Sequence, residues 1–566
     1  MVAVGTSSLL LDEAFAAGDE GFFAELVGST AAKKLKAFAD PWYGDVRPFA
    51  RKMLLRYIDD GCDRPHHRGL VKTLFKLAEL NEDDEAMGHF LVAFDRLVKR
   101  SARSVAGWIR ATRTPTMLVQ MVPDKSVPEK VGNRDTLAPR FSQRTRRYLR
   151  RRAFRYFRGV ARRDPARYAK GIRAALTLYQ DAHLDTPSQI LDAWGLMHAL
   201  YWGSPVLDRQ PRGIRVVAGR SLSELEPAPF CPESWAGSLN GLIELVEKAG
   251  SRTVRVFTIG LLQRDYAAVL GSVKVTRLKG LLRSPHEEVQ TFAAKLLRTA
   301  TGIESLTIEE WLALLRIDNA TALPLICELV VKHLLPARLT LAQCVELACA
   351  RPAPVAEVGL RWARQKPIVG EAGLLAVIAL ARAESPRTRE EAITWVAGLL
   401  ESMEAARDEH VRELLDARYA DVRALGLALF VRAPRFRDST LLWAALSESP
   451  YDDVRAFLVR HLKEREGTFA PETLRHVWVT ILLAVHRGGK SKRSALRQIA
   501  ERVARRPADA GALLPLLGLA LRSVRAPERR NALAAVARAA FLEPALRAAI
   551  ARDLPELALE SSEAAA

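Results

Sequence analysis

The residues best suited to binding chemistry lie between Pro139 and Arg173, where basic side chains are concentrated. This segment carries fourteen Arg and Lys residues and a single acid, Asp164, within a 566-residue chain of formal net charge +20. Guanidinium groups are planar, always charged, and shaped to bind phosphate or carboxylate oxygens in pairs. A row of them favours a polyanionic partner, and we expect nucleic acid backbone, DNA or RNA, to be that partner.

The spacing within this segment indicates an amphipathic helix. Leu149, Ala153, Phe157 and Val160 recur at intervals of 4, 4 and 3 residues, which predicts one buried face. Asp164 is expected to cap a second helix that starts at Pro165. The candidate phosphate-binding residues are Arg144, Arg147, Arg150, Arg151, Arg155, Arg158, Arg162 and Arg163.

Clustered arginines repel one another, by about a few tenths of a kcal/mol for each i,i+4 pair, so something should offset that repulsion. Three explanations stay open at the level of sequence. The arginines bind phosphates, they pair with acids of neighbouring helices or are simply solvated, or they bind an acidic protein. The first explanation predicts an affinity that falls steeply with salt.

A smaller basic patch runs from Arg487 to Arg493 and contains Gly-Gly-Lys-Ser, as a phosphate-binding loop does. The first Gly of that motif is replaced by Ala484, and the preceding residues are typical of a helix rather than a strand, so we do not expect nucleotide binding. We predict a basic loop between helices. Its candidate phosphate contacts are Lys490, Lys492 and Arg493.

The sequence offers one weak candidate for a metal site. Cys62, Asp63, His66 and His67 are close together, but structural zinc normally needs two spaced pairs of ligands, and no second pair is evident. We expect a polar loop there, with no metal and no cofactor. The five cysteines of this long chain also argue against a disulfide framework.

Candidate catalytic residues are limited to isolated acids. Asp181, Asp185 and Asp192, with Trp194 or Trp202 to stack on a base, would suit a base-excision cleft. Helix caps or surface acids are the simpler interpretation, and no hydrolase, metalloprotease or dinucleotide-binding motif appears. We therefore expect a protein without enzyme activity.

The start of the chain has no basic region before Leu9-Leu10-Leu11, and acids follow these leucines directly. This pattern is not that of a signal peptide. We find no stretch of about 18 uncharged apolar residues that would predict a membrane span. We expect a cytoplasmic protein.

The rest of the chain predicts the helices that hold these residues. Hydrophobic residues make up 49% of the composition, enough for a buried core, and short apolar runs alternate with Pro-containing breaks. One short strand is possible at 214–217. We expect N-terminal helical repeats (1–121), a loop or linker (122–141), an arginine-rich helical segment (142–202), a Pro-rich inserted loop (203–238), a repeat array (239–557) and a disordered tail (558–566).

Four segments align without gaps and define an internal repeat. Each has an acid, a Val, and then Arg or Gln: Asp45-Val46-Arg47, Glu288-Val289-Gln290, Asp421-Val422-Arg423 and Asp453-Val454-Arg455. We expect the acid near the start of the second helix of a pair and the Val against the partner helix. We expect the Arg to reach an acid in the adjoining repeat.

This repeat resembles the HEAT-repeat family, whose second helix often begins with Asp-Val-Arg. The resemblance implies an all-α solenoid of stacked helical hairpins, in which each pair buries its two apolar faces against neighbours. Proteins of this family are mainly scaffolds, some bind nucleic acid, and one bacterial branch excises alkylated purines. The fold leaves the function open: a scaffold for nucleic acid is expected, with a scaffold for an acidic protein or a DNA base-excision enzyme as alternatives.

Overall fold

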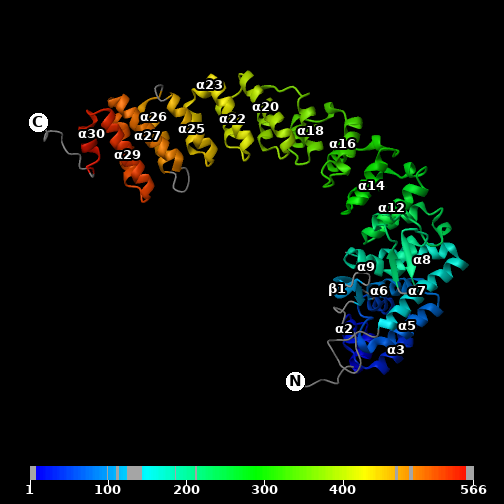
Figure 1. Ribbon diagram of the computed structural model, residues 1–566. Coiled ribbons are helices and arrows are strands. Elements are labelled where there is room, and N and C mark those ends of the chain that lie inside the picture. The colour runs from blue at the N-terminus through cyan, green and yellow to red at the C-terminus, as the bar shows by residue number, and fades with distance from the viewer. Residues whose placement is uncertain are drawn as a thin grey trace. The chain divides into compact units, whose positions relative to one another are not determined.

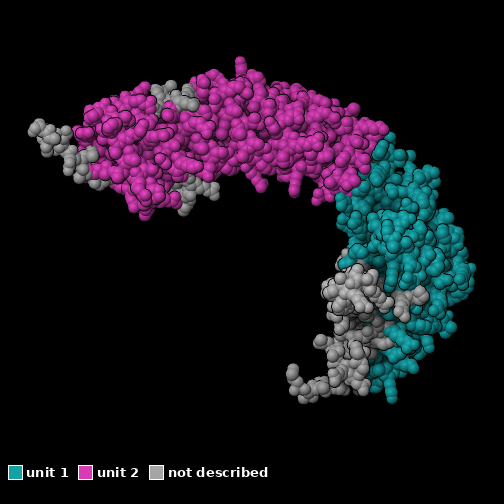
Figure 2. Space-filling view, viewed as in Figure 1, with its two compact units in different colours: residues 1–306 teal, residues 307–566 magenta. Residues whose placement is uncertain are grey.

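The computed structural model describes residues 8–97, 100–109, 114–123, 143–184, 186–210, 213–465, 469–483, 489–555 and 557. These residues form thirty α-helices and two short two-stranded sheets. Figure 1 shows the helices in chain order, and the chain divides into two compact units, Met1–Leu306 and Thr307–Ala566 (Figure 2). None of the helices in the described residues has the length and apolar character that a membrane span requires.

Most of the helices are short and pack against a helix that is adjacent in the chain. Those of the first unit are α1 (Ser8–Ala17), α2 (Phe22–Gly28), α3 (Ala32–Gly44), α4 (Pro48–Asp60), α5 (Arg68–Leu80), α6 (Asp84–Leu97), α7 (Gln143–Arg163), α8 (Pro165–Thr177), α9 (Pro187–Asp192), α10 (Trp194–Tyr201), α11 (Leu239–Lys248), α12 (Arg252–Asp265), α13 (Val275–Leu282) and α14 (Glu287–Leu297).

Those of the second unit are α15 (Ile308–Leu314), α16 (Ala322–His333), α17 (Leu341–Ala348), α18 (Ala353–Ala363), α19 (Gly370–Ile378), α20 (Pro386–Ser402), α21 (Asp408–Leu415), α22 (Ala420–Arg432), α23 (Pro434–Arg437), α24 (Thr440–Glu448), α25 (Asp452–Arg465), α26 (Pro471–Leu483), α27 (Gly489–Arg505), α28 (Ala510–Leu521), α29 (Ala526–Leu542) and α30 (Leu546–Asp553).

Within each unit, hairpins pack on their neighbours, as the predicted solenoid requires. Within the second unit α17 packs on α18, α18 on α20, α20 on α22 and α22 on α25. The helix starts explain why the chain turns where it does: Pro386, Pro434 and Pro471 each occupy the first position of a helix, where the missing N–H is not needed. The predicted all-α fold of stacked HEAT-like hairpins is confirmed.

The fourth residue of the second helix locks the turn inside a hairpin. In six hairpins this residue donates to the carbonyl oxygen six positions earlier, over 2.7–3.1 Å: Arg255, Gln290, Arg389, Arg423, Arg455 and Arg529. That carbonyl lies at or near the end of the first helix, where carbonyls have no partner within the helix. One side chain thereby fixes both the end of one helix and the start of the next.

The same helical position also joins neighbouring hairpins. A cation at the fourth position pairs with an acid near the start of the next second helix, and we call these contacts the inter-repeat rungs. They are Arg51–Asp83, Arg255–Glu288, Arg389–Asp421, Arg423–Asp453 and Lys492–Glu528, at 2.6–3.0 Å. The prediction that the motif Arg reaches an acid in the adjoining repeat is confirmed at Arg423.

The first predicted repeat segment is out of register. Val289, Val422 and Val454 are fully buried, as expected, but Val46 is 96% exposed because it precedes α4 instead of lying within it. Arg47 bonds to Asp45 beside it, and the inter-repeat rung is made by Arg51, four residues further on. The expectation for Val46 and Arg47 was therefore wrong.

A β-hairpin interrupts the first unit where helices were expected up to Met121. Strands β1 (Arg100–Ile109) and β2 (Thr114–Pro123) pair in antiparallel fashion, with Val105 opposite Leu118. The apolar spacing at 105–109 covers little more than one helical turn, too short to distinguish a helix from a strand. The rest of the predicted linker, 124–141, and the predicted tail, 558–566, lie outside the described residues.

The Pro-rich insertion at 203–238 docks on α10. It contains strands β3 (Leu207–Gln210) and β4 (Gly213–Val216), and β4 overlaps the stretch 214–217 where one short strand was considered possible within an inserted loop. Backbone hydrogen bonds from Ala228 and Phe230 to α10 carbonyls anchor its later part. Trp235 is fully buried, and its carbonyl oxygen accepts from the Tyr266 hydroxyl.

Candidate nucleic-acid interface

Helix α7 carries the arginine segment, and its local structure follows the sequence pattern. Leu149, Ala153, Phe157 and Val160 are buried against α6, α8 and α10. Asp164 ends α7 and caps α8, because its side chain accepts from the backbone N–H of Arg167 over 2.9 Å. Both the buried face and the cap were predicted from spacing.

The opposite face of α7 presents arginines to solvent, and we call this set the α7 stripe. Arg144, Arg151, Arg155 and Arg162 are exposed, and Arg147 and Arg158 are half-buried between them. The stripe spans roughly 27 Å, given a rise of about 1.5 Å per helical residue. It consists of Arg144, Arg147, Arg151, Arg155, Arg158 and Arg162.

Four of the six stripe arginines have no acidic partner among the described residues. Within the described part of the chain, Arg144, Arg147, Arg155 and Arg162 form neither an ion pair nor a hydrogen bond through their side chains. Like charges three or four residues apart on a helix repel one another. None of these four guanidinium groups is therefore neutralised by a described residue.

Two other arginines of α7 are buried and serve the fold. Arg150 is 5% exposed and donates to the carbonyl oxygen of Asp192 over 2.8 Å. Its burial lowers the pKa of its guanidinium to about 10, although Asp95 and Asp192 oppose that shift. Arg146 donates to the carbonyl of Leu97 over 2.5 Å. Arg150, a candidate phosphate contact by sequence, thus cannot present its charge at the surface.

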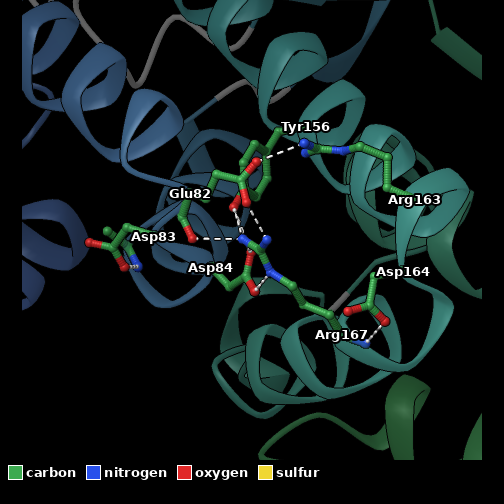
Figure 3. Close-up of polar contacts among 8 residues, drawn as sticks. Glu82, Asp83, Asp84, Tyr156, Arg163, Asp164 and Arg167 are labelled. Carbon is green, nitrogen blue, oxygen red and sulfur yellow. Dashed lines mark hydrogen bonds and ion pairs between the residues drawn. The ribbon is translucent and has the colours of Figure 1, made fainter.

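The arginines facing the α5–α6 turn are paired with acids. Arg152 binds Glu79 at 2.6 Å and Arg163 binds Glu82 at 2.7 Å. Arg167 of α8 reaches both Glu82 and Asp84, with 2.7 Å to the latter, as Figure 3 shows. These pairs fix α7 and α8 against α6. Arg163, another predicted phosphate contact, is therefore exposed but already neutralised.

Arg158 is held by aromatic rings. Its guanidinium carbon lies 5.2 Å from the ring centroid of Trp202 and 5.9 Å from that of Phe230. Arg209 of β3 approaches Trp202 in the same way, at 5.1 Å. Cation–π contacts of this kind orient a guanidinium without neutralising its charge.

The second basic patch is helical rather than a loop, which corrects the prediction for its later part. α27 begins at Gly489, so Lys490, Lys492 and Arg493 all lie in its first turns, while 484–488 lie outside the described residues. Lys490 and Arg493 are exposed. Lys492 is 5% exposed and forms the rung to Glu528, so its ammonium group is committed inside the fold.

Neighbouring basic residues that the sequence analysis did not single out belong to the same surface of the second unit. Arg460 and Lys463 of α25 and Arg497 of α27 line a groove that also contains Lys490. They are separated in the chain by all of α26, so spacing along the sequence could not bring them together. Alignment of the second helices on their fourth residues matches Arg460 with Arg497, each five residues further on, but matches neither Lys463 nor Lys490 to a cation.

Two residues of the weak metal candidate, Cys62 and His67, are buried in the core, whereas His66 is exposed. His67 Nδ1 contacts the Tyr57 hydroxyl over 2.8 Å and Nε2 contacts the carbonyl of Ser29 over 3.1 Å. Burial lowers the pKa of His67 to about 4. Among the described residues, no group of three or more His, Cys, Asp or Glu is placed to hold a metal ion.

The acids considered for base excision have structural contacts. Asp181 accepts from the backbone N–H of Arg252 over 2.5 Å and pairs with Arg255 at 3.0 Å. Asp192 is buried at the end of α9, beneath Arg150. Asp185 lies outside the described residues. Asp181 and Asp192 thus act as cap and core residues.

No protein-family model matches the chain, and no curated protein matches it. Similar solved structures include a mutant of Kap121p, at TM-score 0.23 and 12% identity over 89% of this chain and 50% of that chain. A homology model of the full-length AP-3 complex in an intermediate open conformation matches at TM-score 0.25 and 13% identity, over 94% of this chain and 89% of that one. Kap121p bound to Pho4p matches at TM-score 0.20 and 10% identity, over 97% and 64%.

The chain spans about half the length of the first of these structures. TM-scores and identities this low carry no property of Kap121p or AP-3 over to this chain. The fold assignment rests on its own helical hairpins and on the rungs between them.

Proposed function

We propose that this chain is a non-catalytic HEAT-like scaffold that binds nucleic acid backbone through the α7 stripe. The observation that carries the proposal is the solvent-facing row of Arg144, Arg147, Arg155 and Arg162, which pair with no carboxylate among the described residues. Four other arginines fix the helix that carries this row. They bind backbone carbonyls or acids of neighbouring segments and so hold α7 and α8 in place: Arg146, Arg150, Arg152 and Arg167.

The chemistry of the stripe favours phosphate over sequence readout. Guanidinium forks bind phosphate oxygens in pairs, and each neutralised phosphate releases condensed counterions, which supplies affinity without regard to base sequence. Phosphate contacts position a protein on nucleic acid, whereas contacts to base edges specify sequence. We expect broad sequence tolerance and an affinity that weakens steeply as salt increases.

Reversal of the stripe charge tests the proposal. In the variant Arg147→Glu, Arg155→Glu, Arg162→Glu, affinity for a fluorescent mixed-sequence oligonucleotide should fall at least roughly a hundredfold at low salt, because three phosphate contacts become repulsive. A matched control changes Lys33, Lys36 and Arg68 to Glu, which alters net charge equally at exposed positions of the same unit. That control should lose much less affinity.

Two results would reject the proposal. One is equal affinity of the stripe variant and the control for both single-stranded and duplex DNA and RNA. The other is a stoichiometric complex with an acidic protein that persists at high salt and depends on the stripe, which would favour the protein-scaffold alternative. Unfolding curves of both variants must match the parent chain, so that lost binding is not lost folding.

A further inference from the structure

A second concentration of positive charge lies in the second unit, in a groove between α25 and α27. These are the second helices of consecutive hairpins and pack side by side. The groove has a volume of about 370 Å³, and none of the described residues that line it is acidic. It lies at the small end of the roughly 300–1,000 Å³ range of small-molecule sites. It therefore has room for a phosphate with its sugar, but not for a docked helix.

Four cations face one another across this groove. Arg460 and Lys463 are one turn apart on α25, and Lys490 and Arg497 are two turns apart on α27. All four are exposed, and within the described residues none forms an ion pair or a side-chain hydrogen bond. The one acid within α27, Glu501, is already paired with Arg538 at 3.0 Å.

The groove also has a fixed polar floor. Gln498 is buried, and its Nε2 donates to the carbonyl oxygen of Val459 over 2.6 Å, which ties α27 to α25. Its Oε1 is buried and accepts no hydrogen bond from the described residues. Ser491 and Ser494 line the wall with half-buried hydroxyls. The cations are thus arranged around hydroxyl donors on a rigid base.

We propose that this groove is a second phosphate-binding site that takes a phosphodiester group of a nucleic acid strand. The inference rests on the proposed function only for the class of ligand, since its residues all belong to the other unit. Four cations converging on a space of this size suit a phosphate, with its several anionic oxygens, better than a single carboxylate. Hydroxyl donors between them complete the coordination of the remaining oxygens.

Lysine acetylation footprinting measures directly whether DNA covers this groove. The full chain is treated with acetic anhydride with and without a mixed-sequence DNA oligonucleotide, and acetylation is measured by mass spectrometry. Lys463 and Lys490 should become several-fold less reactive when DNA is bound. Lys332, exposed on α16 outside the groove, serves as the internal control and should be unchanged.

A charge-neutral variant gives an independent measurement. Arg460→Gln with Arg497→Gln keeps helix propensity and removes two phosphate contacts, which should lower oligonucleotide affinity roughly tenfold and reduce the salt slope by about 2. The matched control is Arg338→Gln with Arg361→Gln, at exposed positions of the same unit without an ion pair among the described residues. The control should bind as the parent chain does.

The stripe variant separates this inference from the proposed function. If Lys463 and Lys490 remain protected by DNA in the stripe variant, and the stripe variant binds like its control, the groove is a site and the α7 proposal fails. If DNA binds but leaves both lysines fully reactive, the groove proposal is overturned. It is also overturned if poly-glutamate protects them better than DNA, because an acidic protein would then be the ligand.

Discussion

Arg389 and Asp421 are 32 residues apart in the chain, yet their side chains form an ion pair of 2.9 Å between α20 and α22. The guanidinium carbon of Arg389 also lies 3.6 Å from the ring centroid of Tyr419. Arg423 repeats the arrangement with Tyr451 at 3.7 Å and Asp453 at 2.9 Å. A cation held by a carboxylate, an aromatic ring and a backbone carbonyl is the recurring joint of this solenoid.

Removal of one such joint should destabilise the second unit. Arg423→Leu takes away the buried guanidinium that satisfies the carbonyl of Ala417 and binds Asp453. We expect a loss of about 2 kcal/mol in the free energy of unfolding, since a hydrogen bond to a charged group contributes about 1.5–3 kcal/mol. Urea unfolding followed by circular dichroism measures it.

The exposed pair Arg382–Glu413 is a matched control, because it also links residues 31 positions apart but both side chains are solvated. Arg382→Leu should change the free energy of unfolding by less than about 0.5 kcal/mol. Equal losses in the two variants would contradict a special role for the buried rung.

Two glycines of the second unit should respond to alanine in opposite directions. A Cβ at Gly359 of α18 would lie 2.2 Å from the backbone nitrogen of Ala348, so Gly359→Ala must push α17 and α18 apart. A Cβ at Gly398 of α20 would meet nothing within 4 Å. Gly398→Ala should stabilise by about 0.5–1 kcal/mol through helix propensity.

We expect Gly359→Ala to destabilise the second unit by about 1–3 kcal/mol, as overpacking commonly does. The melting temperatures of the two variants, measured side by side, should move to opposite sides of the parent value. A stabilising Gly359→Ala would show that α17 and α18 are not packed as closely as described.

The buried His67 should make stability depend on pH. Its pKa is about 4 in the folded chain because it is buried, whereas an unfolded histidine titrates near 6.5. Between these values the unfolded state binds a proton that the folded state does not, so stability falls as pH decreases, by up to about 1.4 kcal/mol per pH unit.

His67→Gln should therefore flatten the dependence of the unfolding free energy on pH between about 6.5 and 4. The exposed His476→Gln is its control and should leave that slope as it is in the parent chain. Denaturant titrations at several pH values measure the slope, and an unchanged slope in His67→Gln would count against the buried, neutral imidazole.

Salt titration should distinguish stripe arginines from fold arginines. Arg155→Gln should lower the slope of log affinity against log salt by about 1, because one phosphate contact is lost. Arg152→Gln, whose side chain pairs with Glu79, should leave that slope unchanged and reduce stability instead. Fluorescence anisotropy with a labelled oligonucleotide measures both slopes, and equal slopes would contradict the assignment of Arg155 to the interface.

The sequence predicts the features whose causes are local. The amphipathic spacing of Leu149 and Ala153 and the cap at Asp164 are decided within one or two turns, and the structure confirms them. Whether an arginine is exposed is not local. Arg150 and Arg151 are adjacent, but Arg150 meets a carbonyl 42 residues away and is buried.

The features that the sequence analysis missed depend on residues that are far apart in the chain. The groove between α25 and α27 joins Lys463 and Lys490, which no spacing rule relates because a whole helix separates them. The predicted register of the first repeat was wrong because the triplet Asp45-Val46-Arg47 matches the motif but ends just before α4 begins. Such an error is visible only when the distance from the helix start is known.

α22 both receives a rung from the preceding hairpin, at Asp421, and gives one to the following hairpin, at Arg423. A hairpin with these two residues therefore carries an acid for the hairpin before it and a cation for the hairpin after it. An extra copy of α21 and α22, inserted in register, would form both inter-repeat rungs with the residues already present. The array can therefore lengthen by whole hairpins without any change to the residues on either side.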